Sequence, residues 1–183
     1  MIFFTADTHF NHENICELSN RPFDSLHDME ETIVSRWNSK VGKGDLVYHL
    51  GDFALSWGKK DVDKIESMLS RLNGSKFLVK GNHDRVVVTN SKKWAKVVGL
   101  HEIKVKALDN QRIVLCHYPM RTWNQMARGA WMLHGHCHGN LPDTGGKILD
   151  VGVDCHKFKP VSLDEVAEYM GQRSAINDHR SGR

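Results

Sequence analysis

The chain has 183 residues, of which 40% are hydrophobic and 26% charged, a composition typical of one soluble globular domain. Its formal net charge of +3 does not by itself point to nucleic acid or to a membrane. No apolar run approaches the roughly 20 residues of a membrane span, and the apolar start at residues 2–6 is too short for a signal sequence. We therefore expect a cytoplasmic protein without a membrane partner.

Cysteine and histidine usage narrows the chemistry. The four cysteines lie far apart without a C-x-x-C pair, which argues against a disulfide framework and against a cysteine zinc site. The chain has 12 histidines, an unusual number for its length. The positions of these histidines are therefore informative.

The first predicted strand covers residues 2–6 and leads into Asp7-Thr8-His9. Two residues apart on an extended segment, Asp7 and His9 face the same side, and both can bind a divalent metal. Asn11 and His12 follow closely enough in the sequence to line the mouth of the same candidate metal site.

A loop around Pro22 precedes a helix that Asp24 or Ser25 can cap. The helix buries a stripe at helical spacing, formed by Met29, Ile33, Val34 and Trp37. Arg21, in the loop, is either a solvated arginine or a guanidinium that grips a substrate phosphate with two hydrogen bonds.

A strand, a helix and a second strand follow, over residues 46–50, 62–72 and 75–79. Short connections make this a βαβ unit with parallel strands. The first strand ends in Gly51-Asp52 and the second in Lys80-Gly81-Asn82-His83-Asp84. Asn82 offers a carbonyl ligand, His83 a general acid, and Asp84 a carboxylate that can fix the tautomer of His83.

The lysines around Trp94 suggest a short basic helix within residues 85–99. We expect this helix mainly to present a solvated face. Residues 103–107 and 113–115 predict a hairpin that leads into His117. A short strand over 131–133 leads into His136 and His138. Residues 148–153 predict an edge or closing strand.

A capping box, Ser162 to Glu165, predicts a last helix. We place the domain at residues 1–170 and a polar, basic and flexible tail at 171–183. His49 is predicted to be a hydrogen-bonded core histidine, whereas His134 and His156 are further candidates to reach the site.

Five predicted strands thus end in residues that can bind metal. The candidate ligands are Asp7, His9, Asp52, Asn82, His117, His136 and His138. Strand ends converge on one edge of an α/β sheet. Seven ligands are too many for one tetrahedral zinc and suit two divalent ions that share a carboxylate. We expect Mn²⁺ first, followed by Fe, Zn or Ni.

These motifs, Asp7-x-His9, Gly51-Asp52, Gly81-Asn82-His83-Asp84, His117 and Gly135-His136-x-His138, resemble in order those of the calcineurin-like metallophosphoesterases. The chain's size and its segments 20–23 and 151–154 are similar to small prokaryotic or phage members. The resemblance implies an α/β (α+β) fold, a four-layer β-sandwich of two mixed sheets flanked by helices.

The resemblance also implies the role of each motif residue. Asp7, His9, Asp52 and His138 would hold the first metal, with Asp52 bridging. Asn82, His117 and His136 would complete the second. A hydroxide held between the metals would attack phosphorus, and His83, oriented by Asp84, would protonate the leaving group.

The expected substrate is a phosphodiester, preferably of the nucleotide type, or a phosphomonoester. Arg21, His12, Arg121 and Arg128 are the candidate substrate-binding residues. A nuclease is less favoured, because the net charge is modest and no basic stripe interleaved with aromatic residues is visible. Two further hypotheses are a non-catalytic, metal-bound binding module and a regulatory module that acts through residues 92–96 and the tail. The oligomeric state stays open.

Overall fold

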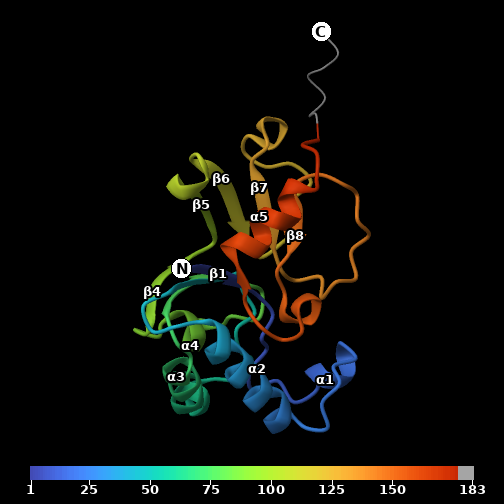
Figure 1. Ribbon diagram of the computed structural model, residues 1–183. Helices are drawn as coiled ribbons and strands as arrows, with labels where there is room; N and C mark the ends of the chain where they lie inside the picture. The colour runs from blue at the N-terminus through green and yellow to red at the C-terminus, as the bar shows by residue number, and fades with distance from the viewer. Residues whose placement is uncertain (177–183) are drawn as a thin grey trace.

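Two mixed β-sheets form the centre of the molecule (Figure 1). The structure is a computed structural model and describes residues 1–176. The first sheet has the order β4-β3-β2-β1-β9 and the second the order β5-β6-β7-β8. The strands are β1 (Ile2–Thr5), β2 (Leu46–His49), β3 (Ser75–Val79), β4 (Trp94–Val98), β5 (Leu100–Val105), β6 (Gln111–Cys116), β7 (Trp131–His134), β8 (Ile148–Asp150) and β9 (Val161–Ser162).

Strand direction places the chemistry-bearing residues at one edge. Strands β1 to β4 are parallel to their neighbours, and β9 runs antiparallel to β1. In the second sheet β5 and β6 form the predicted antiparallel hairpin, whereas β6, β7 and β8 are parallel. The carboxyl ends of β1, β2 and β3 therefore share one edge of the first sheet, and those of β6 and β7 share one edge of the second.

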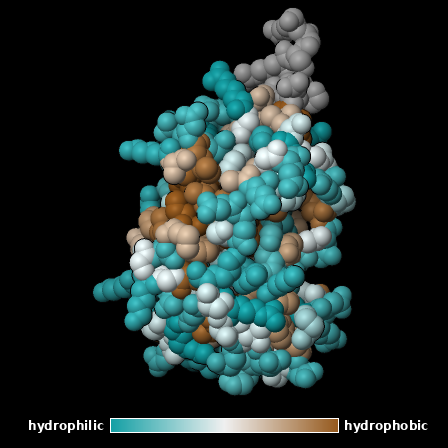
Figure 2. Space-filling view, in the orientation of Figure 1, coloured by the Kyte–Doolittle hydropathy of each residue, from teal (hydrophilic) through white to brown (hydrophobic). Residues whose placement is uncertain are grey.

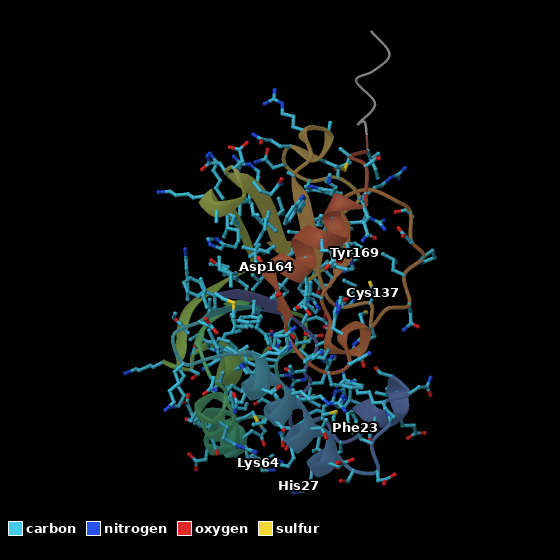
Figure 3. The ribbon with its side chains drawn as sticks, in the orientation of Figure 1. Phe23, His27, Lys64, Cys137, Asp164 and Tyr169 are labelled. Atoms are coloured by element: carbon cyan, nitrogen blue, oxygen red, sulfur yellow. The ribbon has the colours of Figure 1, made fainter. Side chains whose placement is uncertain are left out.

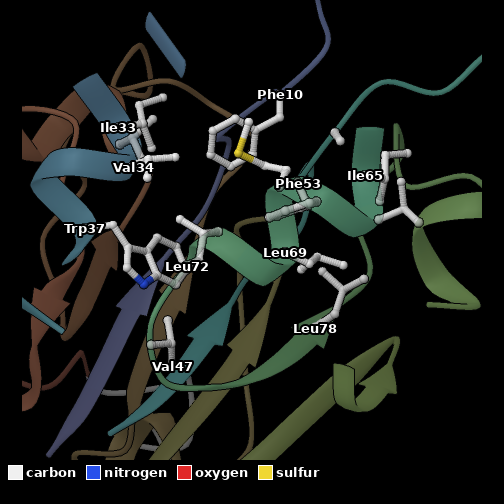
Figure 4. Packing of buried hydrophobic residues seen from close by; sticks show 14 of the residues in the cluster. Phe10, Ile33, Val34, Trp37, Val47, Phe53, Ile65, Leu69, Leu72 and Leu78 are labelled. Atoms are coloured by element: carbon white, nitrogen blue, oxygen red, sulfur yellow. The ribbon is translucent and has the colours of Figure 1, made fainter. Parts of the chain in front are cut away.

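Helices α2 (Leu26–Lys40) and α3 (Val62–Arg71) cover one face of the first sheet (Figures 1 and 4). The Ser25 side chain accepts the Asp28 backbone N–H and so caps α2, as predicted. Fully buried Ile33 and Trp37 on α2 pack in one cluster with Leu69 of α3.

A second core joins the two sheets. Phe3 belongs to the helix-side cluster and Phe4 to the second, because neighbouring side chains of a strand point to opposite faces. The second cluster includes Ile113 of β6, Leu133 of β7 and Val166 of α5 (Leu163–Gly171). The predicted capping box, Ser162 with Glu165, starts α5.

Residues 85–99 differ from expectation. The predicted basic helix around Trp94 is wrong: residues 94–98 form β4, which pairs in parallel with β3 at the end of the sheet. The buried Trp94 indole donates to the carbonyl of Val88, which lies in the short helix α4 (Val86–Thr89). Pairing with β3 and burial of Trp94 decide the conformation here, and both are non-local.

The remaining elements are short. They are α1 (Ile15–Leu18), η1 (Lys59–Asp61), η2 (Lys106–Leu108), η3 (Met126–Arg128) and η4 (Val153–His156). Just after α5, Arg173 contacts Gly146 and Asp143, and residues 177–183 of the predicted tail lie outside the described residues. Within residues 1–176, no helix has the length and apolar character needed to cross a membrane. The face in Figure 2 is mostly hydrophilic, with scattered apolar patches.

Candidate active site

The predicted ligands gather in two clusters at the converging strand ends. Asp7, His9 and His138 form one cluster, and Asp52, His117 and His136 form the other. Within each cluster, one nitrogen or oxygen atom of every residue lies within 4.8 Å of the others. Six of the seven predicted ligands form these two clusters, and the seventh, Asn82, lies beside the second, with its Oδ1 2.9 Å from Nε2 of His117. Cys137, labelled in Figure 3, lies between His136 and His138 in the sequence but belongs to neither cluster.

In the first cluster, hydrogen bonds hold the ligand groups in place. The fully buried Asp7 carboxylate accepts the backbone N–H of His136, with the shorter contact at 2.9 Å. Nδ1 of His138 lies 2.8 Å from a carboxylate oxygen of Asp154. A proton on that Nδ1 leaves Nε2 free to bind a metal, the common arrangement for metal-binding histidines.

In the second cluster, His117 is oriented by a backbone group. Its Nδ1 lies 2.8 Å from the carbonyl oxygen of Leu50, which can only accept, so Nδ1 carries the proton. Its Nε2 faces Asn82 Oδ1 at 2.9 Å and Asp52 Oδ2 at 3.4 Å. A cation among these atoms would have nitrogen and oxygen donors on several sides.

Asp52 belongs to the second cluster and also faces the first. Its Oδ2 is 3.6 Å from Nε2 of His9 and 3.4 Å from Nε2 of His117, so one oxygen faces a histidine of each cluster. Burial opposes ionisation of Asp52, but the hydrogen bond and charge of His117 outweigh it and lower the Asp52 pKa to about 2. This carboxylate therefore has the position of a bridging ligand.

Two buried groups indicate that the site fits divalent cations. Nε2 of His9 is buried and has no hydrogen-bond partner among the described residues. Burial raises the pKa of Asp7 to about 7, because the nearby groups do not fully compensate a charged carboxylate there. Unpartnered buried polar atoms are uncommon, and a metal ion would satisfy both groups.

Five of the candidate ligands have an unusual backbone conformation. Left-handed φ values occur at Asp7 (57°), His9 (51°), Asp52 (54°), His136 (71°) and His138 (49°). Each such residue costs free energy, and such conformations concentrate at functional sites. The turns after β1, β2 and β7 thus adopt unfavourable backbone conformations, and these conformations place the side chains of the candidate ligands at the site.

Gly135 allows the two sheets to approach at the site. A Cβ at this position would lie 2.5 Å from Cβ of Ala6 and 2.6 Å from Oδ2 of Asp7. No side chain fits there without displacing Asp7. The glycine of the Gly135-His136-x-His138 motif is therefore explained by packing.

His83 lies half-buried beside the first cluster. Its backbone N–H donates to Asp52 Oδ1 at 2.8 Å, and its ring centre is 5.4 Å from that of His9. His12 is also close, with Nδ1 3.2 Å from Nδ1 of His9 and its ring centre 6.0 Å from that of His83. Both side chains are placed to contact a ligand above the clusters.

The predicted contact of Asp84 with the His83 ring is wrong. The buried Asp84 carboxylate accepts three backbone N–H groups, those of Gly81, Asp52 and Phe53, each at 2.9 Å. Because these groups lie in two loops, Asp84 ties the loop after β2 to the loop after β3. It supports the positions of Asp52 and His83 through the backbone.

Arg21 is not the solvated or phosphate-gripping residue that its loop position predicts. Its guanidinium is buried and binds both oxygens of Asp154, each at 2.8 Å. It also donates to the carbonyl oxygens of Asp7 and Thr8, at 2.7 and 3.2 Å. Arg21 thus joins the turn that carries Asp7 to the carboxylate that orients His138.

Asp154 is absent from the predicted ligand set, although it holds both His138 and Arg21. The only signal was its place in the segment 151–154, directly after the predicted closing strand. Its partners lie 16 and 133 residues away in the sequence, and no local pattern links them.

The other arginines and histidines that the sequence singled out differ in where the structure places them. Exposed Arg128 lies in η3, which precedes β7 and so sits at the opposite end of that strand from His136. Arg121 is exposed in the loop after His117 and stays a prediction. His134 and His156 bond to the carbonyls of Gly135 and Asp150 and belong to neither cluster. His49 is fully buried and bonds to Thr8 Oγ1 at 3.0 Å, as predicted for a core histidine.

Known proteins place the chain in a family. A model of the calcineurin-like phosphoesterases matches residues 1–163. The chain is 33% identical over 181 residues to the uncharacterized protein MJ1445 of Methanocaldococcus jannaschii, covering 96% of this chain and 94% of that protein. It is 25% identical to the Gene 66 protein of Mycobacterium phage D29, covering 99% and 98%. A solved structure, the protein of unknown function AQ665 from Aquifex aeolicus, has a similar fold, with a TM-score of 0.71 and 26% identity over 92% of this chain and 98% of that one. This chain therefore belongs to the calcineurin-like phosphoesterase family.

Proposed function

We propose that the protein is a hydrolase with two divalent metals that cleaves phosphodiesters, preferably of the nucleotide type. The observation that carries this proposal is the pair of candidate ligand clusters, in which Oδ2 of Asp52 faces His9 of one and His117 of the other, with Nε2 of His9 buried and unpartnered among the described residues. Asp7, His9 and His138 would hold one metal, His117, His136 and Asn82 the other, and Asp52 both. When bound, the metals would supply Lewis acidity that activates water and neutralises the phosphoryl oxygens.

The chain's own residues would orient the metal-binding histidines, donate a proton and contact the substrate. Asp154 holds the proton on Nδ1 of His138 and the Leu50 carbonyl holds that on Nδ1 of His117, so both Nε2 atoms face the site. His83, half-buried at the mouth, would donate a proton to the leaving oxygen. His12, beside His83, would contact the substrate.

His83→Ala tests the proposed proton donor. We expect this variant to keep its metals, because His83 belongs to neither cluster, and to lose about 10²- to 10⁴-fold in kcat. Asp52→Asn, in contrast, should lose metal as well. The assay measures bound Mn²⁺ by mass spectrometry together with hydrolysis of an aryl phosphodiester and its monoester.

Three outcomes would change the proposal. Full turnover by His83→Ala would remove the role of His83. A protein that binds no metal in excess Mn²⁺ would contradict the site. Bound metal without hydrolysis of either ester would favour a binding module on the same fold.

A further inference from the structure

An exposed tryptophan stands next to the candidate active site on a fixed backbone. Trp57 is 64% exposed, although its backbone N–H donates to the buried carboxylate of Asp61 at 2.6 Å. Asn11, two residues after His9, donates to the carbonyl oxygen of Leu55 in the same loop. Gly58 follows with a φ of 140°, which only glycine adopts readily. The loop is thus anchored to the turn after β1, and its indole is directed away from the core.

Trp57 lines two clefts, and each cleft is also lined by residues of the candidate active site. One cleft, of about 530 Å³, is lined by Trp57 together with His12 and His83. The other, of about 420 Å³, is lined by Trp57 together with Asn82. The first has the size of a small-molecule site. A ligand that contacts His83 can therefore reach the indole through continuous open space.

The surroundings of Trp57 are rich in cations. The Arg85 guanidinium lies 5.3 Å from the centre of the indole ring, and Arg85 lines both clefts. Lys60 and Lys64 line the first cleft; Lys64 is on α3, as Figure 3 shows. Within residues 1–176, the carboxylates that line the two clefts are those of Glu13, which is exposed, Asp61, which holds the Trp57 backbone, and Asp84, which accepts three backbone N–H groups. An aromatic face with flanking cations suits a ligand that has both a flat ring and phosphates.

We propose that Trp57 and Arg85, with Lys60 and Lys64, form a subsite for the nucleoside next to the scissile phosphate of a single-stranded nucleic acid. The base would stack on the indole face that Arg85 leaves open, and the cations would bind the neighbouring phosphates. This subsite rests on the proposed function, because it places the reacting phosphate beside His83. Trp57 and Arg85 are 28 positions apart, so no basic aromatic stripe is visible in the sequence.

Two phosphodiesters with the same leaving group test the subsite. Thymidine 5′-(p-nitrophenyl phosphate) has a base, methyl p-nitrophenyl phosphate has none, and both release p-nitrophenol. We expect the wild type to prefer the thymidine ester, and Trp57→Ala to lower the ratio of the two kcat/KM values about tenfold, mainly through KM for the thymidine ester. Trp57→Phe should restore part of the ratio. Trp123→Phe, which changes a half-buried indole bonded to Ala130, should keep the ratio. An unchanged ratio in Trp57→Ala would overturn the proposal.

Binding without turnover separates the subsite from the hydrolase function. The probe is fluorescein-labelled tetrathymidylate with hydrolysis-resistant phosphorothioate linkages, titrated by anisotropy into the Mn²⁺-reconstituted protein. We expect Trp57→Ala to raise Kd about tenfold. The double change Lys60→Gln and Lys64→Gln should reduce the slope of log K against log salt by about 1.4.

The outcomes are distinct. Trp57-dependent binding with no hydrolysis of either ester would support the subsite and contradict the hydrolase. Hydrolysis of the methyl ester without thymidine preference or Trp57-dependent binding would overturn the subsite and leave the hydrolase. Equal weakening in Trp57→Ala and Trp123→Phe would also overturn it.

Discussion

Arg21 shows how a residue can shape the site without contacting substrate. Its planar guanidinium bonds at once to Asp154 and to the carbonyl oxygens of Asp7 and Thr8. A lysine keeps the charge but cannot reproduce this fork of donors. We therefore expect Arg21→Lys to weaken Mn²⁺ binding at the Asp7 cluster about 10- to 100-fold, the usual effect of losing a group that positions ligands.

Calorimetric titration with Mn²⁺ measures this effect. Arg36→Lys is the matched control, because Arg36 makes one exposed hydrogen bond to the Lys157 carbonyl, and it should bind metal as the wild type does. A separate change, Asp154→Asn, should lower the free energy of unfolding by about 3–5 kcal/mol, because it leaves the buried Arg21 guanidinium without its counter-charge. Wild-type metal affinity in Arg21→Lys would show that the fork is dispensable.

His49 makes the fold sensitive to acid. Burial lowers its pKa from 6.5 to about 3. Because Thr8 Oγ1 donates to the carbonyl oxygen of Phe53, His49 donates to Thr8 through Nε2 and is neutral. Between these pKa values the unfolded chain takes up a proton and the folded chain does not. The stability that neutral His49 contributes is therefore fully present above pH 6.5 and is lost as the pH falls toward 3.

Urea unfolding at pH 7 and pH 5, in chelator, tests this linkage. His49 should account for a loss of about 2 kcal/mol between these pH values. His49→Gln, which can still bond to Thr8, should lack this part of the pH dependence. His27→Gln, which removes an exposed histidine, should keep it. A wild-type pH dependence in His49→Gln would contradict the prediction.

At the scale of elements, the approach of β1 to β7 decides whether the site can form. Gly135 follows β7 and lies against Ala6 and Asp7, which follow β1. Gly135→Ala would force these turns apart, at a cost of about 1–3 kcal/mol in the free energy of unfolding. Because Asp7 must move, metal content should fall too. Denaturant unfolding and metal analysis measure both effects.

Gly44→Ala provides the comparison for this substitution. A Cβ at Gly44 would meet no atom of residues 1–176 within 4 Å, and Gly44 lies in the turn before β2, at the opposite end of that strand from Asp52. We expect stability near that of the wild type and full metal content. Equal behaviour of the two glycine variants would show that the sheets tolerate a wider separation than the structure has.

At the scale of the whole molecule, local pattern predicts most of the elements and the candidate ligands that the structure brings together, but not their long-range partners. Apolar strands that end in Asp7, Asp52 or His117 are local signals, so the strand ends and the metal-competent residues were predictable. The conformation of Trp94 depends on pairing with β3, and the role of Arg21 depends on Asp154, which is 133 residues away. The surroundings of these residues arise only when the chain folds.

The division of ligands between the sheets has a consequence for the whole fold. Asp7, His9, Asp52 and Asn82 follow strands of the first sheet, whereas His117, His136 and His138 follow strands of the second. Metals held by both sets would connect the two sheets and bind only the folded chain. At 100-fold excess over Kd, one such site stabilises by about 2.7 kcal/mol.

For a chain of this length, that stabilisation should raise the Tm in Mn²⁺ about 5–10 °C above the Tm in chelator. Thermal unfolding followed by circular dichroism measures the shift. Asp52→Asn, which changes the carboxylate that faces both clusters, should lose most of this shift, while His83→Ala should keep it because His83 belongs to neither cluster. If Mn²⁺ raised the Tm of Asp52→Asn as much as that of the wild type, the ions would bind elsewhere, and the two clusters would not be the link between the sheets.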